Sequence, residues 1–138
     1  MRDHMATEFE LSFKGSSRNM LDAISVLAEH NVNLETVATA KVEDTWVIKF
    51  VTGSEEEVRR SFMKADLHFN EKPVMVVEMH NKPGQWLKVA RALNEAGIEI
   101  NASYLLSQHG DTQRFVFGVS DREKASKVCR VLSECSVD

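Results

Sequence analysis

The run from Met79 to Gly84 has the residue types of a small-molecule binding loop. Pro83 fixes one backbone angle, and Gly84 allows a tight turn and a close approach of a ligand to the backbone. The amides from Gln85 onward point out of the start of a predicted helix, where a carboxylate binds readily. Asn81 can donate and accept hydrogen bonds, as the two charged groups of an amino acid require. The segment therefore predicts an amino-acid site, with a plain strand-to-helix turn as the alternative.

Residues for catalysis or metal binding are not grouped in the sequence. The histidines are isolated from one another and lack metal-ligand spacing. The two cysteines, Cys129 and Cys135, form neither a CxxC pair nor a Cys/His cluster, and Cys129 is expected to be a small buried apolar residue. No nucleophile–base pair or carboxylate pair is recognisable. We therefore expect a protein without catalytic residues, metal or cofactor.

A period of 66 residues relates the two halves of the chain and determines which elements position this loop. Identities are few, but apolar positions recur at this spacing, as in Leu27 with Leu93 and Val32 with Ile98. Such a period indicates one supersecondary unit used twice.

In the first copy, alternating polar and apolar residues predict a half-buried strand, followed by a helical stripe and a β-branched strand. Asn31 is expected to end the first helix, because asparagine tolerates the left-handed conformation. Ser54 and Glu57 have the spacing of a capping box at the start of a second helix. The predicted order is strand 8–13, helix 20–28, strand 32–41, strand 46–51, helix 54–65 and strand 67–70.

The second copy repeats this order. Gly97 stands at the expected C-terminal cap of its first helix, and Ser120 and Glu123 form a second capping-box pattern. The predicted elements are strand 74–79, helix 84–96, strand 98–107, strand 114–119, helix 120–132 and a very short strand 134–137.

The sequence thus predicts an α+β fold of two tandem ferredoxin-like βαββαβ modules. Each module would have an antiparallel four-stranded sheet with its helices on one face. The predicted domains are 8–71 and 74–138, joined at Glu71-Lys72-Pro73, which is too short for free domain motion. Residues 1–7 are expected to be a leader or a cloning remnant outside the fold.

The second copy resembles the ACT domain signature. The resemblance rests on Asn81-Lys82-Pro83-Gly84, Leu87, Leu93, Gly97, Ile98 and Ile100. The stretch through Tyr104 and Leu105 is also similar to the regulatory domain of phosphoglycerate dehydrogenase. Residues 8–137 as a whole resemble small stand-alone proteins made of two ACT repeats and no enzyme. The first copy matches less well, because Gly15-Ser16-Ser17-Arg18 stands where Pro-Gly would be.

The resemblance implies a regulatory module that binds an amino acid at an interface between modules or subunits. In serine-binding members one asparagine comes from the Pro-Gly loop, which Asn81 matches, and another from the start of the second strand. Glu99 stands at this second position, whereas the first copy has Asn33. If the binding mode is kept, Glu99 favours a ligand with a positive end. The expected ligand-binding residues are Asn81, Lys82, Pro83, Gly84, Gln85, Trp86, Ile98, Glu99 and Asn33.

The expected partners, besides the ligand, are a second copy of the chain and an enzyme or regulator that the sequence does not identify. Two small cores cannot easily cover every apolar face, and sheet edges offer unpaired backbone groups, so a homodimer is expected. A formal charge of −4 argues against a nucleic-acid partner. No apolar run is long enough to span a membrane, and no signal peptide is recognisable, so a cytoplasmic location is expected.

Three other functions fit less well. A structural dimerisation module without ligand is the main alternative. An acylphosphatase-like enzyme would need a phosphate-binding loop, and the loop around Arg18 lacks the glycine-rich sequence. An RNA-recognition module would need stacking aromatics on its third strand, at Trp46 and Phe50 or at Phe115 and Phe117, but the flanking basic and glycine pattern is absent.

Overall fold

The computed structural model describes residues 2–135 and divides the chain into two compact units. The first unit is Thr7–Lys72, and the second combines the chain from Pro73 onward with the residues up to Ala6. Strands and helices are both present in each unit, so the α+β class is confirmed.

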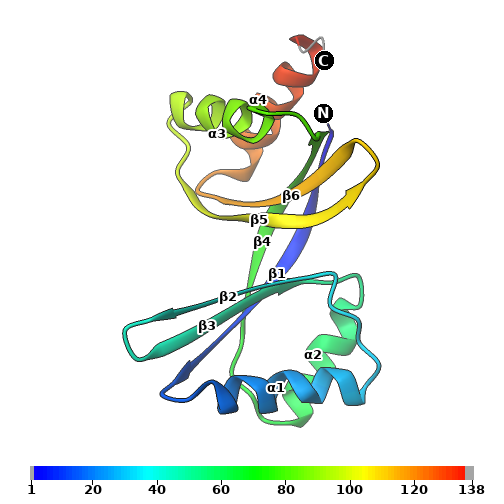
Figure 1. Cartoon of the computed structure of the whole chain (residues 1–138), viewed down its shortest axis with the longest axis vertical. Helices are drawn as coiled ribbons and strands as arrows, with labels where there is room; N and C mark the ends of the chain where they lie inside the picture. The colour runs from blue at the N-terminus through cyan, green and yellow to red at the C-terminus, as the bar shows by residue number, and fades with distance from the viewer. Residues whose placement is uncertain (1, 136–138) are drawn as a thin grey trace. The chain divides into compact units, whose positions relative to one another are not determined.

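The first unit is a sheet with two helices on one face (Figure 1). The strand order is β2-β3-β1, both pairs are antiparallel, and Phe9 of β1 lies opposite Phe50 of β3. The elements that form this unit are β1 (Arg2–Lys14, from Thr7 on), α1 (Ser17–Glu29), β2 (Thr36–Val42), β3 (Thr45–Val51) and α2 (Glu55–Lys64).

Aromatic side chains fill the core of the first unit. The rings of Phe9 and Phe50 stack at 5.5 Å between centroids, and Phe62 of α2 meets Phe50 edge-on at 6.1 Å. Phe69 lies 5.4 Å from Phe62. Leu27 of α1 is 1% exposed in the same cluster. These contacts explain why α1 and α2 pack on the face of the sheet that carries the phenylalanines.

The second unit also has two helices on one face of its sheet (Figure 1). The strand order is β1-β4-β6-β5, with antiparallel pairing of β6 to β4 and to β5. Its core joins three side chains of β4 that point to one face with apolar residues of both helices and Phe117. The elements are β4 (Asn70–His80, from Pro73 on), α3 (Gln85–Glu95), β5 (Ile100–His109), β6 (Thr112–Val119) and α4 (Arg122–Cys135).

The expectation that residues 1–7 lie outside the fold is wrong. Residues from Arg2 onward belong to β1, and those up to Ala6 belong to the second unit. The Ser126 hydroxyl of α4 donates a hydrogen bond to the Asp3 carboxylate at 2.7 Å. This start of the chain is therefore part of the packed structure.

The predicted linker and both predicted last strands also differ from the structure. Strand β4 starts at Asn70 and runs through Pro73, whose fixed φ is compatible with extended backbone, so no linker separates the copies. Residues 67–69 form no strand. Glu134 and Cys135 belong to α4 rather than to a final strand, and residues 136–137 of that predicted strand lie outside the described residues.

The two predicted capping boxes are wrong as well, although a cap exists near one of them. Ser54 makes no side-chain cap hydrogen bond at the start of α2. At α4 the cap is Asp121, whose carboxylate accepts from the Lys124 amide at 3.0 Å. The Ser120 hydroxyl accepts instead from the Glu99 amide. Asn31, by contrast, has a φ of 57° and takes the predicted left-handed conformation.

Candidate functional site

The β4–α3 loop, residues 81–84, is exposed and is held by backbone hydrogen bonds. The Asn81 amide donates to the Asp111 carbonyl at 2.6 Å, and the Lys82 amide donates to the His80 carbonyl at 2.9 Å. Gly84 precedes α3 with a φ of 86°, in the left-handed region. A Cβ on Gly84 would meet no atom within 4 Å, so the backbone conformation, not close packing within this chain, requires glycine here.

Helix α3 begins with two side chains that differ in their contacts. The Gln85 amide donates to the Lys82 carbonyl at 3.3 Å, and its buried Oε1 has no hydrogen-bond partner among residues 2–135. Trp86 donates from Nε1 to the Ser103 hydroxyl at 3.0 Å and stacks on Phe117 at 6.0 Å. The indole is nevertheless 39% exposed, because one side of the ring borders an open groove.

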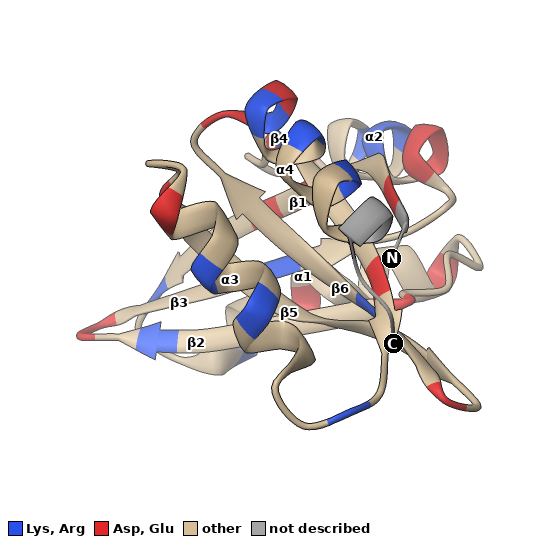
Figure 2. Cartoon of the chain, turned by 90° about the horizontal axis from the view of Figure 1, so that it is seen from above, with Lys and Arg blue, Asp and Glu red and all other residues tan. Residues whose placement is uncertain are grey.

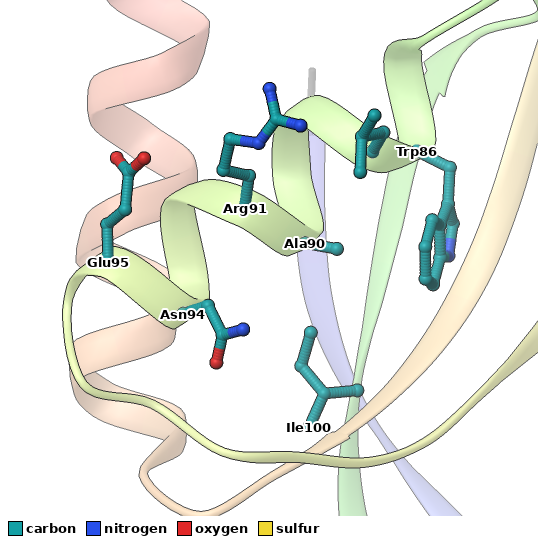
Figure 3. A pocket seen from close by; sticks show the side chains of 7 residues that line it. Trp86, Ala90, Arg91, Asn94, Glu95 and Ile100 are labelled. Atoms are coloured by element: carbon teal, nitrogen blue, oxygen red, sulfur yellow. The ribbon is translucent and has the colours of Figure 1, made fainter.

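This groove, the α3–β5 groove, has a volume of about 660 Å³ and lies between α3 and the start of β5 (Figure 3). Figure 3 shows Ala90 and Asn94 pointing toward Ile100, with the Trp86 ring at one end. Arg91 and Glu95 project from the side of α3 that is farther from Ile100. The residues that line it are Trp86, Leu87, Ala90, Arg91, Asn94, Glu95 and Ile100.

The α3–β5 groove combines an apolar wall with three polar side chains. The wall consists mainly of Trp86, Leu87 and Ile100. Within residues 2–135, the side chains of Arg91, Asn94 and Glu95 have no hydrogen bond or ion pair. A guanidinium, an amide and a carboxylate of α3 are therefore available to a ligand, with Asn94 on the side that faces Ile100 and Arg91 and Glu95 on the farther side.

Of the predicted site residues, only Trp86 lines this groove. Gly84 lies at a different hollow, between α3 and α4. Ile98 is 1% exposed and part of the core. Glu99 is exposed on the segment before β5, where its carbonyl accepts from the Ser120 amide at 3.0 Å. Asn33 is exposed in the first unit, and its carbonyl accepts from the Thr52 hydroxyl.

Sequence reasoning missed the polar residues of the groove, namely Arg91, Asn94 and Glu95. It also did not name Leu87 as a site residue, although Leu87 is 48% exposed and lines the groove beside Trp86. The sequence did contain a usable signal. The α3 residues of the groove are three neighbouring pairs, 86–87, 90–91 and 94–95, spaced four positions apart, and positions four apart lie on the same side of a helix.

Other kinds of site find no support within the described residues. No group of three or more histidine, cysteine, aspartate or glutamate side chains among them could hold a metal ion. Cys129 is buried in the core, and burial followed by the nearby Asp3 charge raises the pKa of its thiol to about 11. Such a thiol is a poor nucleophile near neutral pH. No described helix combines the length and apolar character of a membrane-crossing segment.

No known protein family matches the sequence, and no curated protein sequence is similar to it. Solved structures do resemble it. Protein BT0572 from Bacteroides thetaiotaomicron aligns with a TM-score of 0.83 at 21% identity, over 99% of this chain and 92% of that one. The ligand-free regulatory subunit of aspartate kinase from Thermus thermophilus aligns with a TM-score of 0.66 at 11% identity, over 97% of each chain.

Part of a longer enzyme chain also aligns with this protein. Aspartokinase III from E. coli, in complex with lysine and aspartate, aligns with a TM-score of 0.55 at 13% identity. The alignment covers 96% of this chain and 31% of the enzyme. The identities are low, so the likeness to these neighbours is one of fold rather than of sequence. The chain therefore has the ACT-like fold found in the regulatory parts of aspartate kinases.

Proposed function

We propose that this protein is a non-catalytic regulatory module of two ACT-type repeats that binds an amino acid in the α3–β5 groove. The observation that carries the proposal is the composition of that groove. Arg91, Asn94 and Glu95 of α3 line the groove together with the apolar residues Trp86 and Ile100. Ligand sites of proteins commonly combine an apolar lining with a few polar groups that orient the ligand.

Each part of an amino acid has a counterpart in the groove. The Arg91 guanidinium can donate two hydrogen bonds to the carboxylate of the ligand. The Glu95 carboxylate and the Asn94 amide oxygen can accept hydrogen bonds from the ammonium group. The Trp86 ring and Ile100 can contact an apolar side chain. This arrangement favours an apolar amino acid, whereas Glu99, outside the groove, would have favoured a ligand with a positive end.

The loop before α3 remains part of the proposed site. Asn81, Lys82, Pro83 and Gly84 are exposed and lead directly into Gln85, whose side-chain oxygen lacks a partner among the described residues. A ligand that extends beyond Trp86 would meet these residues at the helix start, where backbone amides favour a negative group.

The structural neighbours support a regulatory role. Several are regulatory subunits or domains of aspartate kinase, and the E. coli enzyme was solved with lysine and aspartate. An amino acid is therefore the ligand class that we propose for this chain.

Tryptophan fluorescence tests the proposal directly. In a Trp46→Phe background the emission comes from Trp86, which lines the groove. Titration with each common amino acid should reveal one or more that change the emission saturably. Arg91→Ala should weaken that binding at least about tenfold, because a charge-assisted hydrogen bond contributes about 1.5–3 kcal/mol. Ser25→Ala, at the equivalent position of α1, is the matched control and should leave binding unchanged. The absence of any saturable response at millimolar concentrations would refute ligand binding in this groove.

A structural dimerisation module is the second candidate, favoured by exposed apolar side chains. Trp86, Leu87 and Leu105 are 39–48% exposed on α3 and β5, and β5 is the last strand of its unit's sheet. In that case sedimentation equilibrium would show a dimer that Leu105→Asp dissociates, while no amino acid changes Trp86 emission. A homodimer that also binds an amino acid would agree with the first proposal.

A further inference from the structure

Helices α3 and α4 leave an apolar groove on the second unit. A hollow of about 290 Å³ between them is lined by Ala92 of α3 and by Val128, Val131 and Leu132 of α4. Val131 is 56% exposed. A second hollow, of about 460 Å³, shares Ala92 and Leu132 with the first and extends to Gly84 and Leu87. We call the two together the α3–α4 groove.

Basic side chains surround the α3–α4 groove. Lys124 and Lys127 line one hollow, and Lys88 and Arg91 line the other, where Glu95 is the single acidic lining residue. Figure 2 shows the basic segments on both helices. Among the side chains that the structure describes, residues 3–132, those of Lys124, Lys127 and Arg91 have no hydrogen-bond or ion-pair partner. This local charge is opposite in sign to the −4 of the whole chain.

We propose that the α3–α4 groove binds an acidic amphipathic helix of a partner protein. A helix laid in a groove between two helices buries its apolar stripe on the floor, here Ala92, Val128, Val131 and Leu132. Its flanking carboxylates then face Lys124 and Lys127 on one side and Arg91 on the other. Protein interfaces usually have an apolar centre surrounded by polar and charged residues. The sign of the surrounding charge determines which partners bind well.

A second copy of this chain is a poor occupant. If the groove paired with its own copy about a two-fold axis, lysines would face lysines, and like charges across an interface are unfavourable. The acidic run Glu55, Glu56 and Glu57 on α2 of a second copy is not free to occupy the groove either. Its carboxylates are paired with Arg59 and Arg60.

The proposal does not depend on amino-acid binding, although the two grooves share α3. Leu87, Arg91 and Glu95 line both of them. A ligand on one side of α3 therefore contacts residues that a partner helix would touch from the other side. The docking experiment below is done without amino acids, so that its result stands by itself.

Synthetic peptides test the docking surface. The probe is an acidic helical peptide with leucine at positions i, i+3, i+4 and i+7 and glutamate on its other faces. One control replaces every glutamate with lysine, and another keeps the composition but scrambles the leucine stripe. With ¹⁵N-labelled protein, the acidic peptide should shift the amide signals around Ala92, Val128 and Val131, and neither control should. Equal shifts from the lysine peptide, or shifts confined to another surface, would overturn the proposal.

Charge-reversal variants complete the test. The double variant Lys124→Glu, Lys127→Glu should weaken binding of the acidic peptide at least tenfold. Lys64→Glu on α2 is the matched control and should leave the affinity unchanged. Circular dichroism of each variant checks that it folds. Val131→Asp, at a 56% exposed position, should weaken binding of the acidic peptide to the same extent while both lysines keep their charge. Unchanged affinity in the folded variants, or tighter binding of single-stranded RNA or anionic vesicles than of the acidic peptide, would reject the acidic-helix assignment.

Discussion

The first helices of the two units occupy equivalent places but present different side chains. In α3 the outer face carries Arg91, Asn94 and Glu95 beside Trp86. The equivalent positions of α1 are Ser25, Ala28 and Glu29 beside Met20. Only Glu29 keeps the charge of its counterpart. The two units thus share the helix and its core contacts, whereas, apart from the glutamate, the polar side chains that we propose to bind a ligand occur on α3 and not at the matching positions of α1.

The two cores differ in a similar way. The first unit packs four phenylalanines around each other, whereas methionine and valine side chains of β4 surround Phe117 in the second. The first unit also has Arg59 of α2 paired with Glu55, Glu56 and Glu71 and lying over the Phe9 ring at 5.7 Å. The hydrogen bond to Glu71 is the main reason why the pKa of Arg59 is raised above its ordinary value.

The largest expected effect tests the shared framework. Leu27 and Leu93 are equivalent core residues, 1% and 0% exposed. We expect Leu27→Ala and Leu93→Ala each to lower the free energy of unfolding by about 2–5 kcal/mol, since each leaves a cavity in a closed core. Urea denaturation measures both. A loss below about 1 kcal/mol in only one of them would break the equivalence of the units.

A smaller effect tests the loop that starts α3. Gly84 has a φ of 86°, and an L-residue pays about 1–2 kcal/mol in the left-handed region, so Gly84→Ala should cost about that much stability. Gly53→Ala is the control in the first unit, because Gly53 lacks a positive φ and its added Cβ would make one ordinary contact at 3.7 Å to Glu35. Equal losses from both variants in thermal unfolding would show that Gly84 has no special conformational role.

The sequence predicted the elements well because periodicity reports directly on which face of an element is buried. The alignment of the two copies failed in the second half of the repeat for an identifiable reason. Phe9 lies opposite Phe50, and Met75 lies opposite Phe117. Phe9 and Met75 are 66 residues apart, whereas Phe50 and Phe117 are 67 apart. The spacing changes within the second copy.

Leu106 accounts for the extra residue. The register of β5 against β6 shifts between Leu105 and Ser107, so Leu106 is inserted as a bulge and is buried. After the bulge, Ser54 corresponds to Asp121 rather than to Ser120. A fixed period of 66 could not reveal this, because a one-residue insertion in a strand leaves the apolar pattern on either side intact.

The candidate site was less predictable than the fold. The loop 81–84 has recognisable residue types, but the α3–β5 groove depends on how far α3 stands from Ile100 and on which helix positions remain uncovered. Leu87 and Val89 are similar in the sequence, yet Leu87 is 48% exposed and Val89 is fully buried. The difference arises from the rotation of the helix on the sheet, which a hydrophobic stripe fixes only roughly.

The smallest expected effect tests the corrected alignment of the two repeats. Asp121 accepts a hydrogen bond from the Lys124 amide and lies at the N-terminus of α4, where its charge also favours the helix dipole. Asp121→Ala should therefore cost about 1 kcal/mol. Ser54, the corresponding residue at α2, makes no side-chain cap hydrogen bond, so Ser54→Ala should change the stability by less than about 0.5 kcal/mol. Ser120→Ala distinguishes the two alignments: its hydroxyl accepts from the Glu99 amide and caps no helix. If that variant loosens α4 in hydrogen exchange as much as Asp121→Ala does, the cap has been assigned to the wrong residue.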